Sequence, residues 1–136
     1  MAATALSPST DLVPVRSIVA VSIVVVIRDD PRKSHRPVEG LRIALGLSTG
    51  ENPLTIVLLD EATLLLAADP DDLDEEIADS DILMKHLPVL KELQVPFVLP
   101  QGTRSRLCLD PGFMVREASA DDIASLTARA ERVLVF

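Results

Sequence analysis

Ser17-Ile-Val-Ala-Val-Ser-Ile-Val-Val-Val-Ile27 carries the strongest structural signal in the sequence. The run is rich in β-branched residues and almost continuously apolar, which is typical of a central strand buried on both faces of a parallel sheet. With 11 residues it is too short to cross a bilayer. The polar loop Arg28–His35 follows it, and a helix is predicted to begin near Arg36-Pro37, because proline suits the first helical turn.

Short apolar runs alternate with amphipathic segments along the rest of the chain. Further strands are predicted at 54–59, 96–99, 113–117 and 132–136. Helices are predicted from Arg36 to Gly46 or Gly50, over 60–67 with Asp60 as cap, over 80–93, and over 119–130 after a near capping box. Pro88 should kink the third helix or split it. The alternation predicts an α/β domain with a mainly parallel five-stranded sheet covered by helices on both sides.

The composition restricts the classes of partner that the chain can have. Its 136 residues suffice for one domain, and we expect residues 1–15 to form a flexible leader before a domain at 16–136. A net charge of −8 and an aromatic content of 2% argue against binding to nucleic acid or to an anionic membrane surface. The leader lacks the basic region of a signal peptide, so a cytoplasmic protein is expected.

Negative charge is concentrated in one connection. Asp60–Asp81 holds ten acidic residues and no basic one, whereas the rest of the chain carries 13 basic residues against 11 acidic ones. We interpret this segment as a solvated loop; the alternative is a docking surface for a basic partner or a lip over a site. The segment has no glycine at the place where a calcium-binding loop needs one, so no metal site is predicted there. The sequence also contains no cofactor-binding motif.

The order of segments resembles one known family. The segments that carry the resemblance are Pro37–Leu47, Thr55–Asp60, Ala62–Ala67, Leu90–Val95 and Ala130–Phe136. Their succession, over about residues 17–136, resembles the DsrE/DsrF-like (TusD/TusC-like) family of sulfur-relay proteins. The resemblance implies a three-layer α/β/α domain that assembles into dimers, trimers or hexamers, with other sulfur-relay proteins as candidate partners.

The resemblance also points to a turn. Active members of the family carry a persulfide on a cysteine just after the third strand, and one branch has Cys-Gly-Thr-Cys there. This chain has Gln101-Gly-Thr-Arg104, so Gly102 and Thr103 match while Gln101 and Arg104 replace the sulfur carriers. Family members without this cysteine are partners in a larger assembly. The resemblance thus implies a non-catalytic binding or assembly subunit of sulfur metabolism, and leaves open a sulfurtransferase that uses Cys108.

Cys108, the single cysteine, has two interpretations. Because the sequence has only one cysteine, an internal disulfide and a cysteine-based zinc site are excluded. Arg104 and Arg106 could stabilise a reactive thiolate, whereas Leu107 and Leu109 beside it favour burial. We expect a buried structural cysteine and keep catalysis at Cys108 as the alternative.

The carboxyl ends of parallel strands supply the other candidate binding residues, since ligands of open α/β sheets bind there. These candidates are His35, Asp60, Gln101, Gly102, Thr103, Arg104 and Arg106. The Gln101–Arg104 turn either holds an anion through backbone N–H groups and arginine, or is an ordinary strand-to-helix turn. His35 is either an acid/base or anion contact, or the solvated side chain that we prefer.

Surplus apolar surface on the first predicted helix and on the helix predicted over 80–93 indicates self-association. Ile43, Ala44 and Leu47 flank the stripe of Val38, Leu41 and Leu45 that one sheet face would cover. Large exposed apolar patches on a soluble domain usually mark interfaces. We expect a homo-oligomer, and the family resemblance implies a trimer or a hexamer.

Overall fold

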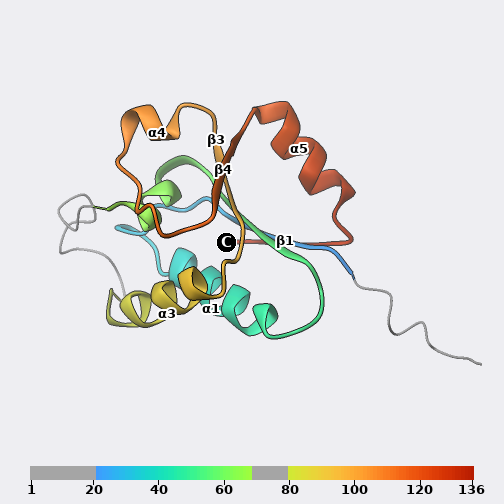
Figure 1. Ribbon diagram of the computed structural model, residues 1–136, viewed down its shortest axis with the longest axis horizontal. Helices are drawn as coiled ribbons and strands as arrows, with labels where there is room; N and C mark the ends of the chain where they lie inside the picture. Colours follow the sequence, from blue (N-terminus) through green and yellow to red (C-terminus); the bar gives the residue numbers. More distant parts are fainter. Residues whose placement is uncertain (1–20, 69–79) are drawn as a thin grey trace, which may run out of the picture.

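Strands and helices alternate through residues 21–68 and 80–136, the part of the chain that the computed structural model describes. In chain order they are β1 (Ile23–Ile27), α1 (Arg36–Ser48), β2 (Leu54–Leu58), the 3-10 helix η2 (Asp60–Leu66), α3 (Ser80–Glu92), β3 (Phe97–Pro100), α4 (Thr103–Arg106), β4 (Val115–Ala118), α5 (Ala120–Arg129) and β5 (Arg132–Val135). The strands form one sheet of order β4-β3-β2-β1-β5, and every pair in it is parallel (Figure 1). The predicted five-stranded parallel sheet is therefore confirmed.

β1 is an interior strand of the sheet, between β2 and β5. Its five residues are all buried, as the continuous apolar run predicts for a strand covered on both faces. Ile23 pairs with Leu54 of β2 on one side and with Arg132 of β5 on the other. The predicted start of this strand, residues 17–20, lies outside the described residues, as does the leader 1–15.

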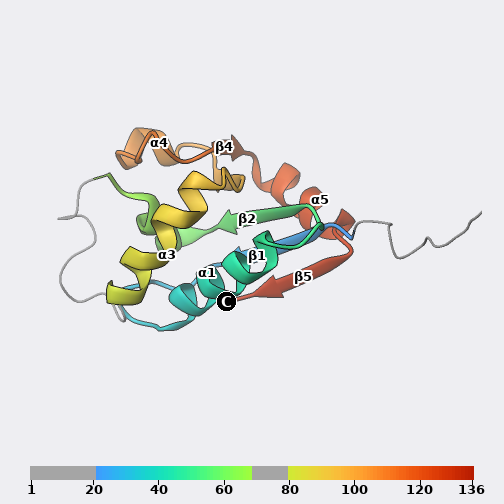
Figure 2. The same ribbon diagram turned by 60° about the horizontal axis from the view of Figure 1, so that its bottom comes forward.

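Helices cover both faces of the sheet and make three layers (Figure 2). Ile23, Val25 and Ile27 face α1, α3 and η2, and they belong to the larger hydrophobic cluster. Val24 and Val26 face the opposite way, toward a smaller cluster that includes Ile123 of α5. Alternating side chains of one strand thus contribute to both cores.

The ends of several elements differ from the sequence predictions. Asp60 is not the cap of η2: it has a φ of 53°, and the N-cap residue is Leu59, without a side-chain hydrogen bond. The chain leaves β2 through this left-handed residue, which places Asp60 inside the first turn instead of before it. Pro88 lies on the exposed side of α3, and the helix continues through it, so the predicted split is wrong. The cap of α5 is confirmed, because Ser119 Oγ accepts the Asp122 N–H at 3.1 Å.

The acidic connection begins as packed structure. Ala62, Leu65 and Leu66 of η2 are buried, so this part of the connection is not a solvated loop. Residues 69–79, with most of its carboxylates, lie outside the described residues. No helix in the described part of the chain is long and apolar enough to span a membrane.

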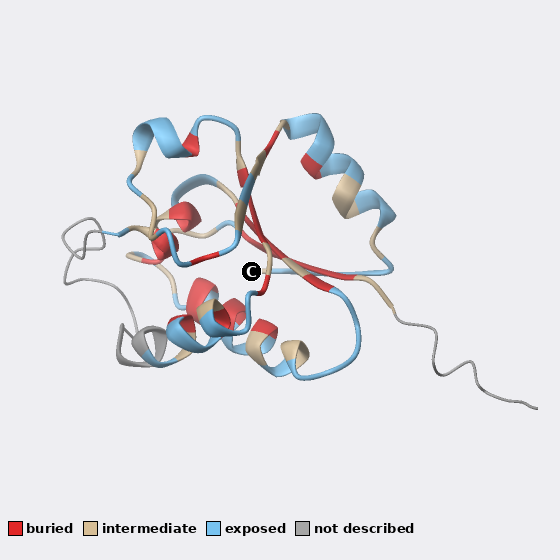
Figure 3. Cartoon of the chain, viewed as in Figure 1, coloured by how far each residue is buried: buried red, intermediate tan, exposed pale blue. Residues whose placement is uncertain are grey.

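Burial is uneven across the sheet (Figure 3). β1, β2 and β3 are almost wholly buried, whereas every residue of the edge strand β5 is exposed. On α1, Val38, Leu41 and Ala44 are buried, and Ile43 is exposed. Of the residues predicted to form a surplus apolar surface, Ile43 therefore belongs to the surface and Ala44 to the core.

Candidate functional site

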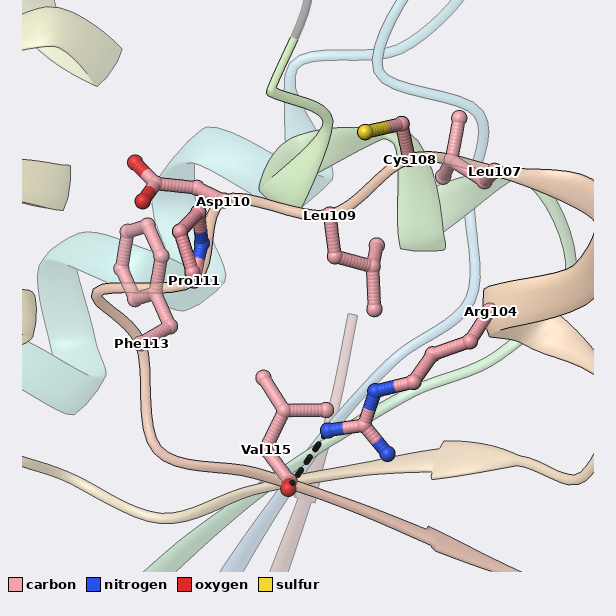
Figure 4. Close-up of a pocket in the computed structure, with 8 residues that line it drawn as sticks. All are labelled: Arg104, Leu107, Cys108, Leu109, Asp110, Pro111, Phe113 and Val115. Carbon is pink, nitrogen blue, oxygen red and sulfur yellow. Dashed lines mark hydrogen bonds between the residues drawn. The ribbon is translucent and has the colours of Figure 1, made fainter.

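The connection from β3 to β4 builds a pocket of about 390 Å³ at the carboxyl end of β3 (Figure 4). It is lined by Arg104, Leu107, Cys108, Leu109, Asp110, Pro111, Phe113 and Val115. The connection folds as the turn Gln101–Gly102, the short helix α4, and then an extended loop. The short helix α4 begins inside the Gln101–Arg104 segment, for which a strand-to-helix turn is one of the two predictions from the sequence.

The Gln101–Arg104 turn has anion-binding geometry, and its anion is a side chain of the same chain. Gly102 has a φ of 90°, a left-handed conformation that glycine adopts without strain. This turn directs two backbone N–H groups at one carboxylate: Gly102 N–H donates to Glu117 Oε1 at 3.2 Å, and Arg104 N–H donates to Oε2 at 2.7 Å. The Arg104 amide, with help from the Gly102 amide and the Arg104 charge, holds the pKa of Glu117 below its ordinary value.

The side chains of the turn are also engaged in hydrogen bonds. Arg104 reaches across the mouth of the pocket, where its Nη2 donates to the carbonyl oxygen of Val115 at 3.0 Å (Figure 4). Thr103 is buried, and its hydroxyl donates to the Pro100 carbonyl at 2.6 Å. Gln101 and Arg106 are exposed. The turn is thus fastened to β3 and β4 by both its backbone and its side chains.

Cys108 is exposed, so the expectation of a buried cysteine is wrong. The reason lies in the pairing of its segment with residues 67–68. Leu109 forms an antiparallel bridge with Ala67, and the Ala68 N–H donates to the Cys108 carbonyl at 2.8 Å. Alternate side chains of an extended segment face opposite ways, so Leu107 and Leu109 are half-buried while Cys108 faces out. In Figure 4 its thiol points away from the guanidinium of Arg104.

An ion pair holds the far wall of the pocket to α3. Lys91 Nζ donates to Asp110 Oδ2 at 2.8 Å and lies 5.3 Å from the centre of the Phe113 ring. The Lys91 hydrogen bond, followed by the Gly112 amide, lowers the pKa of Asp110. Asp110 is therefore a stable carboxylate, which suits a structural role better than proton transfer.

Two candidate residues lie apart from this pocket. His35 is the N-cap residue of α1, exposed and without a side-chain cap hydrogen bond, and Asp60 is exposed after β2. They belong to the ends of β1 and β2, where Arg32 pairs with Asp30 at 2.9 Å and with Glu61 at 3.2 Å. Neither His35 nor Asp60 lines the β3–β4 pocket.

Sequence reasoning missed Glu117, which holds the turn. A lone glutamate inside a predicted strand carries no local signal of this role. Its position follows from the sheet, because parallel pairing places Glu117 beside Leu99 at the end of β3. Within residues 21–68 and 80–136, the His, Cys, Asp and Glu side chains form no group of three that could hold a metal ion.

Comparisons with known proteins identify the fold. No protein-family model matches the chain, and no curated protein matches it. Among solved structures, the chain is similar to the crystal structure of the ychN protein from E. coli, with a TM-score of 0.65 and 27% sequence identity. The match covers 85% of this chain and 99% of that chain. Since ychN is a DsrE-like protein, the fold of this chain is DsrE-like, as the family resemblance implied.

Proposed function

We propose that this protein is an oligomeric, non-catalytic subunit of cytoplasmic sulfur metabolism, which binds or assembles with sulfur-relay partners without carrying sulfur itself. The observation that carries the proposal is the contact of Glu117 with the turn after β3. The resemblance implies a sulfur carrier at that turn, and this chain has Gln101 and Arg104 there. Both amides that could stabilise a sulfur anion bind the Glu117 carboxylate instead.

Electrostatics supports the same conclusion. In persulfide transfer an acceptor thiolate attacks the terminal sulfur and the carrier cysteine leaves as a thiolate, so a carrier site needs donors that stabilise negative charge on these sulfurs. At this turn the donors already face a carboxylate whose lowered pKa keeps it ionised near neutral pH. An anionic sulfur species would meet a negative charge in the place where it needs a positive one. A turn arranged in this way favours binding and assembly over sulfur transfer.

A second candidate function is favoured by the exposure of Cys108. A sulfurtransferase needs an accessible thiol, and Cys108 is exposed at a pocket that Arg104 also lines. Against it stands the direction of the thiol, which points away from the Arg104 guanidinium (Figure 4). That guanidinium is moreover engaged by the Val115 carbonyl. We therefore rank this candidate second.

Persulfide trapping on the purified full chain separates the two. The protein is incubated with inorganic polysulfide and then with an alkylating agent, and the mass of the Cys108 peptide is measured. Because polysulfide modifies any exposed thiol to some extent, the same chain in denaturant sets the background, and Cys108→Ser verifies the assignment. We expect the folded chain to gain no more sulfur than the denatured one. A clear excess in the folded state, transferable to an acceptor thiol, would establish the sulfurtransferase instead.

A further inference from the structure

The edge strand β5 has the composition of a central strand. Val133, Leu134 and Val135 are exposed by 38%, 37% and 48%, although they form an uninterrupted apolar run. The register with β1 places Val133 and Val135 on the α5 face of the sheet and Leu134 on the α1 face. β5 is therefore apolar on both faces, a pattern that parallel strands show when both faces are covered. Among the described strands, it has a neighbour on one side only.

The backbone of β5 offers hydrogen-bonding groups on its free side. The Arg132 N–H donates to Ser22 O at 3.1 Å, and the Phe136 N–H donates to Val26 O at 2.8 Å. The backbone N–H and C=O groups of the even-numbered residues of this segment therefore point toward β1. By alternation, Val133 and Val135 direct their N–H and C=O groups away from β1. The Val135 carbonyl confirms this direction, since it accepts Arg36 Nη2 at 3.0 Å. A carbonyl oxygen has two lone pairs and can accept a second donor.

The sequence of β5 is symmetric about Leu134. If a second β5 pairs antiparallel with Leu134 opposite Leu134, then Val133 lies opposite Val135 on both sides of the symmetry axis. The backbone N–H and C=O groups of both valines point away from β1, toward the second copy. Each Val133–Val135 pair can therefore exchange two backbone hydrogen bonds, and the Leu134 pair takes the non-hydrogen-bonded position. The symmetric order of the side chains and the positions of the free backbone groups thus indicate the same register. Such agreement favours a second copy of this chain over an unrelated strand.

The surface around β5 fits the same occupant. A two-fold axis through the Leu134 pair places both copies of α1 on one side of the joined sheet. Gly40 of α1 approaches the Phe136 ring, and Ile43, three residues further along that side, is 36% exposed. Ile43 therefore extends the apolar surface of this edge beyond the strand itself. Glu131 and Arg132 have opposite charges, so this edge adds no net repulsion to the charge of −8.

We infer that two copies of this chain pair through β5, antiparallel about Leu134, and form a continuous sheet across a two-fold axis. The inference rests on the oligomerisation in the proposed function and names its surface. Edge-to-edge pairing of this kind also covers an apolar strand edge that would otherwise recruit other chains.

Light scattering on Leu134→Lys tests the surface, with refractive-index detection because the chain has no Trp or Tyr. In the paired state the substitution sets two like charges opposite each other, so we expect the mass to fall to half that of the wild type. Val89→Lys is the matched control, since Val89 is 39% exposed on α3, away from β5, and should keep the wild-type mass. Far-UV circular dichroism checks that both variants remain folded.

Cross-linking tests the register without a disruptive charge. Directly opposite Cα atoms in the non-hydrogen-bonded position lie about 4.5 Å apart, within disulfide reach. In a Cys108→Ser background, Leu134→Cys should form a covalent dimer under mild oxidation, and Val89→Cys should not. An oligomer whose mass ignores Leu134→Lys and whose Leu134→Cys variant does not cross-link overturns the surface alone. A monomeric wild type overturns both the surface and the oligomeric part of the proposed function.

Discussion

The carboxylate of Glu117 accepts the backbone N–H of Arg104 at 2.7 Å and so closes the turn that follows β3. A second bond, from the Gly102 N–H at 3.2 Å, makes the contact bidentate. The guanidinium of the same Arg104 bonds back to the Val115 carbonyl, on the strand that carries Glu117. β4 and the turn are therefore joined by interactions in both directions, and the pocket beside them has a fixed rim.

Replacing Glu117 should expose the donors of this turn. We expect Glu117→Ala to lower the urea midpoint of unfolding, because two backbone N–H groups lose their ionised acceptor. Added sulfate should then raise the thermal midpoint of Glu117→Ala more than that of the wild type, since a free anion can take the vacated place. Sodium chloride at equal ionic strength and Glu117→Gln, which keeps one acceptor oxygen, are the controls. Equal sulfate responses in all three proteins would show that the turn has no special affinity for anions.

Two glycines should respond to alanine with opposite signs. Gly102 has a φ of 90°, where a Cβ is strained, so Gly102→Ala should cost about 1–2 kcal/mol of unfolding free energy. Gly46 lies inside α1 with nothing within 4 Å of an added Cβ, so Gly46→Ala should stabilise by about 0.5–1 kcal/mol. Urea titrations of the two variants measure both values. Stabilisation by Gly102→Ala would contradict the left-handed turn.

The strands could be predicted from the sequence because their signal is local. The apolar run of β1 requires burial on both faces wherever the strand lies, and the cap at Ser119 depends on residues three apart. The roles of Glu117 and Cys108 depend on pairing between distant segments. Glu117 reaches the turn because of its register with Leu99, and Cys108 faces out because Leu109 pairs with Ala67. No pattern along the chain encodes either pairing.

In the candidate site, too, the feature with a local sequence signal could be predicted, and the feature that depends on a distant segment could not. The resemblance locates the turn at Gln101–Arg104, and in the structure two backbone amides of that turn bind the Glu117 carboxylate. What fills it could not be predicted, because the carboxylate comes from a strand 13 residues after Arg104. The sequence groups His35 and Asp60 with the turn because all of them follow predicted parallel strands. Sharing one edge of a sheet does not bring them to one pocket, since side-chain contacts there depend on the loops.

Cys108 should behave as an accessible thiol without a structural role. An alkylating reagent should modify it in the folded protein at a rate close to that of the unfolded chain, since its side chain is exposed. Cys108→Ser should change the unfolding free energy by less than about 0.5 kcal/mol, as is usual for surface substitutions. Mass spectrometry over time gives the rate, and urea titration gives the stability. Strong protection of the thiol in the folded state would contradict the outward orientation of Cys108.

Lys91 should contribute more to the unfolding free energy than an ordinary exposed lysine does. It combines an ion pair to Asp110 with a position over the Phe113 ring, and each contact is worth at most about 1 kcal/mol at a partly exposed site. We therefore expect Lys91→Met, which keeps the apolar stem, to lower the unfolding free energy by about 1 kcal/mol. Lys85→Met, on an exposed part of the same helix α3, is the control and should have a smaller effect. Equal effects of the two substitutions would mean that the wall does not depend on this contact.

Acid should lower the unfolding free energy of the protein by protonating Asp110 and Glu117. The folded state lowers the pKa of both carboxyls, from ordinary values of 3.8 and 4.5, so between the folded and unfolded values the unfolded chain binds more protons. Their stabilisation is therefore complete above pH 4.5 and is lost as the pH falls through the folded-state values. Urea midpoints measured from pH 7 down to pH 3 should fall less steeply for the double variant Asp110→Asn/Glu117→Gln than for the wild type. Parallel curves for the two proteins would mean that neither carboxylate is held by the contacts around the pocket.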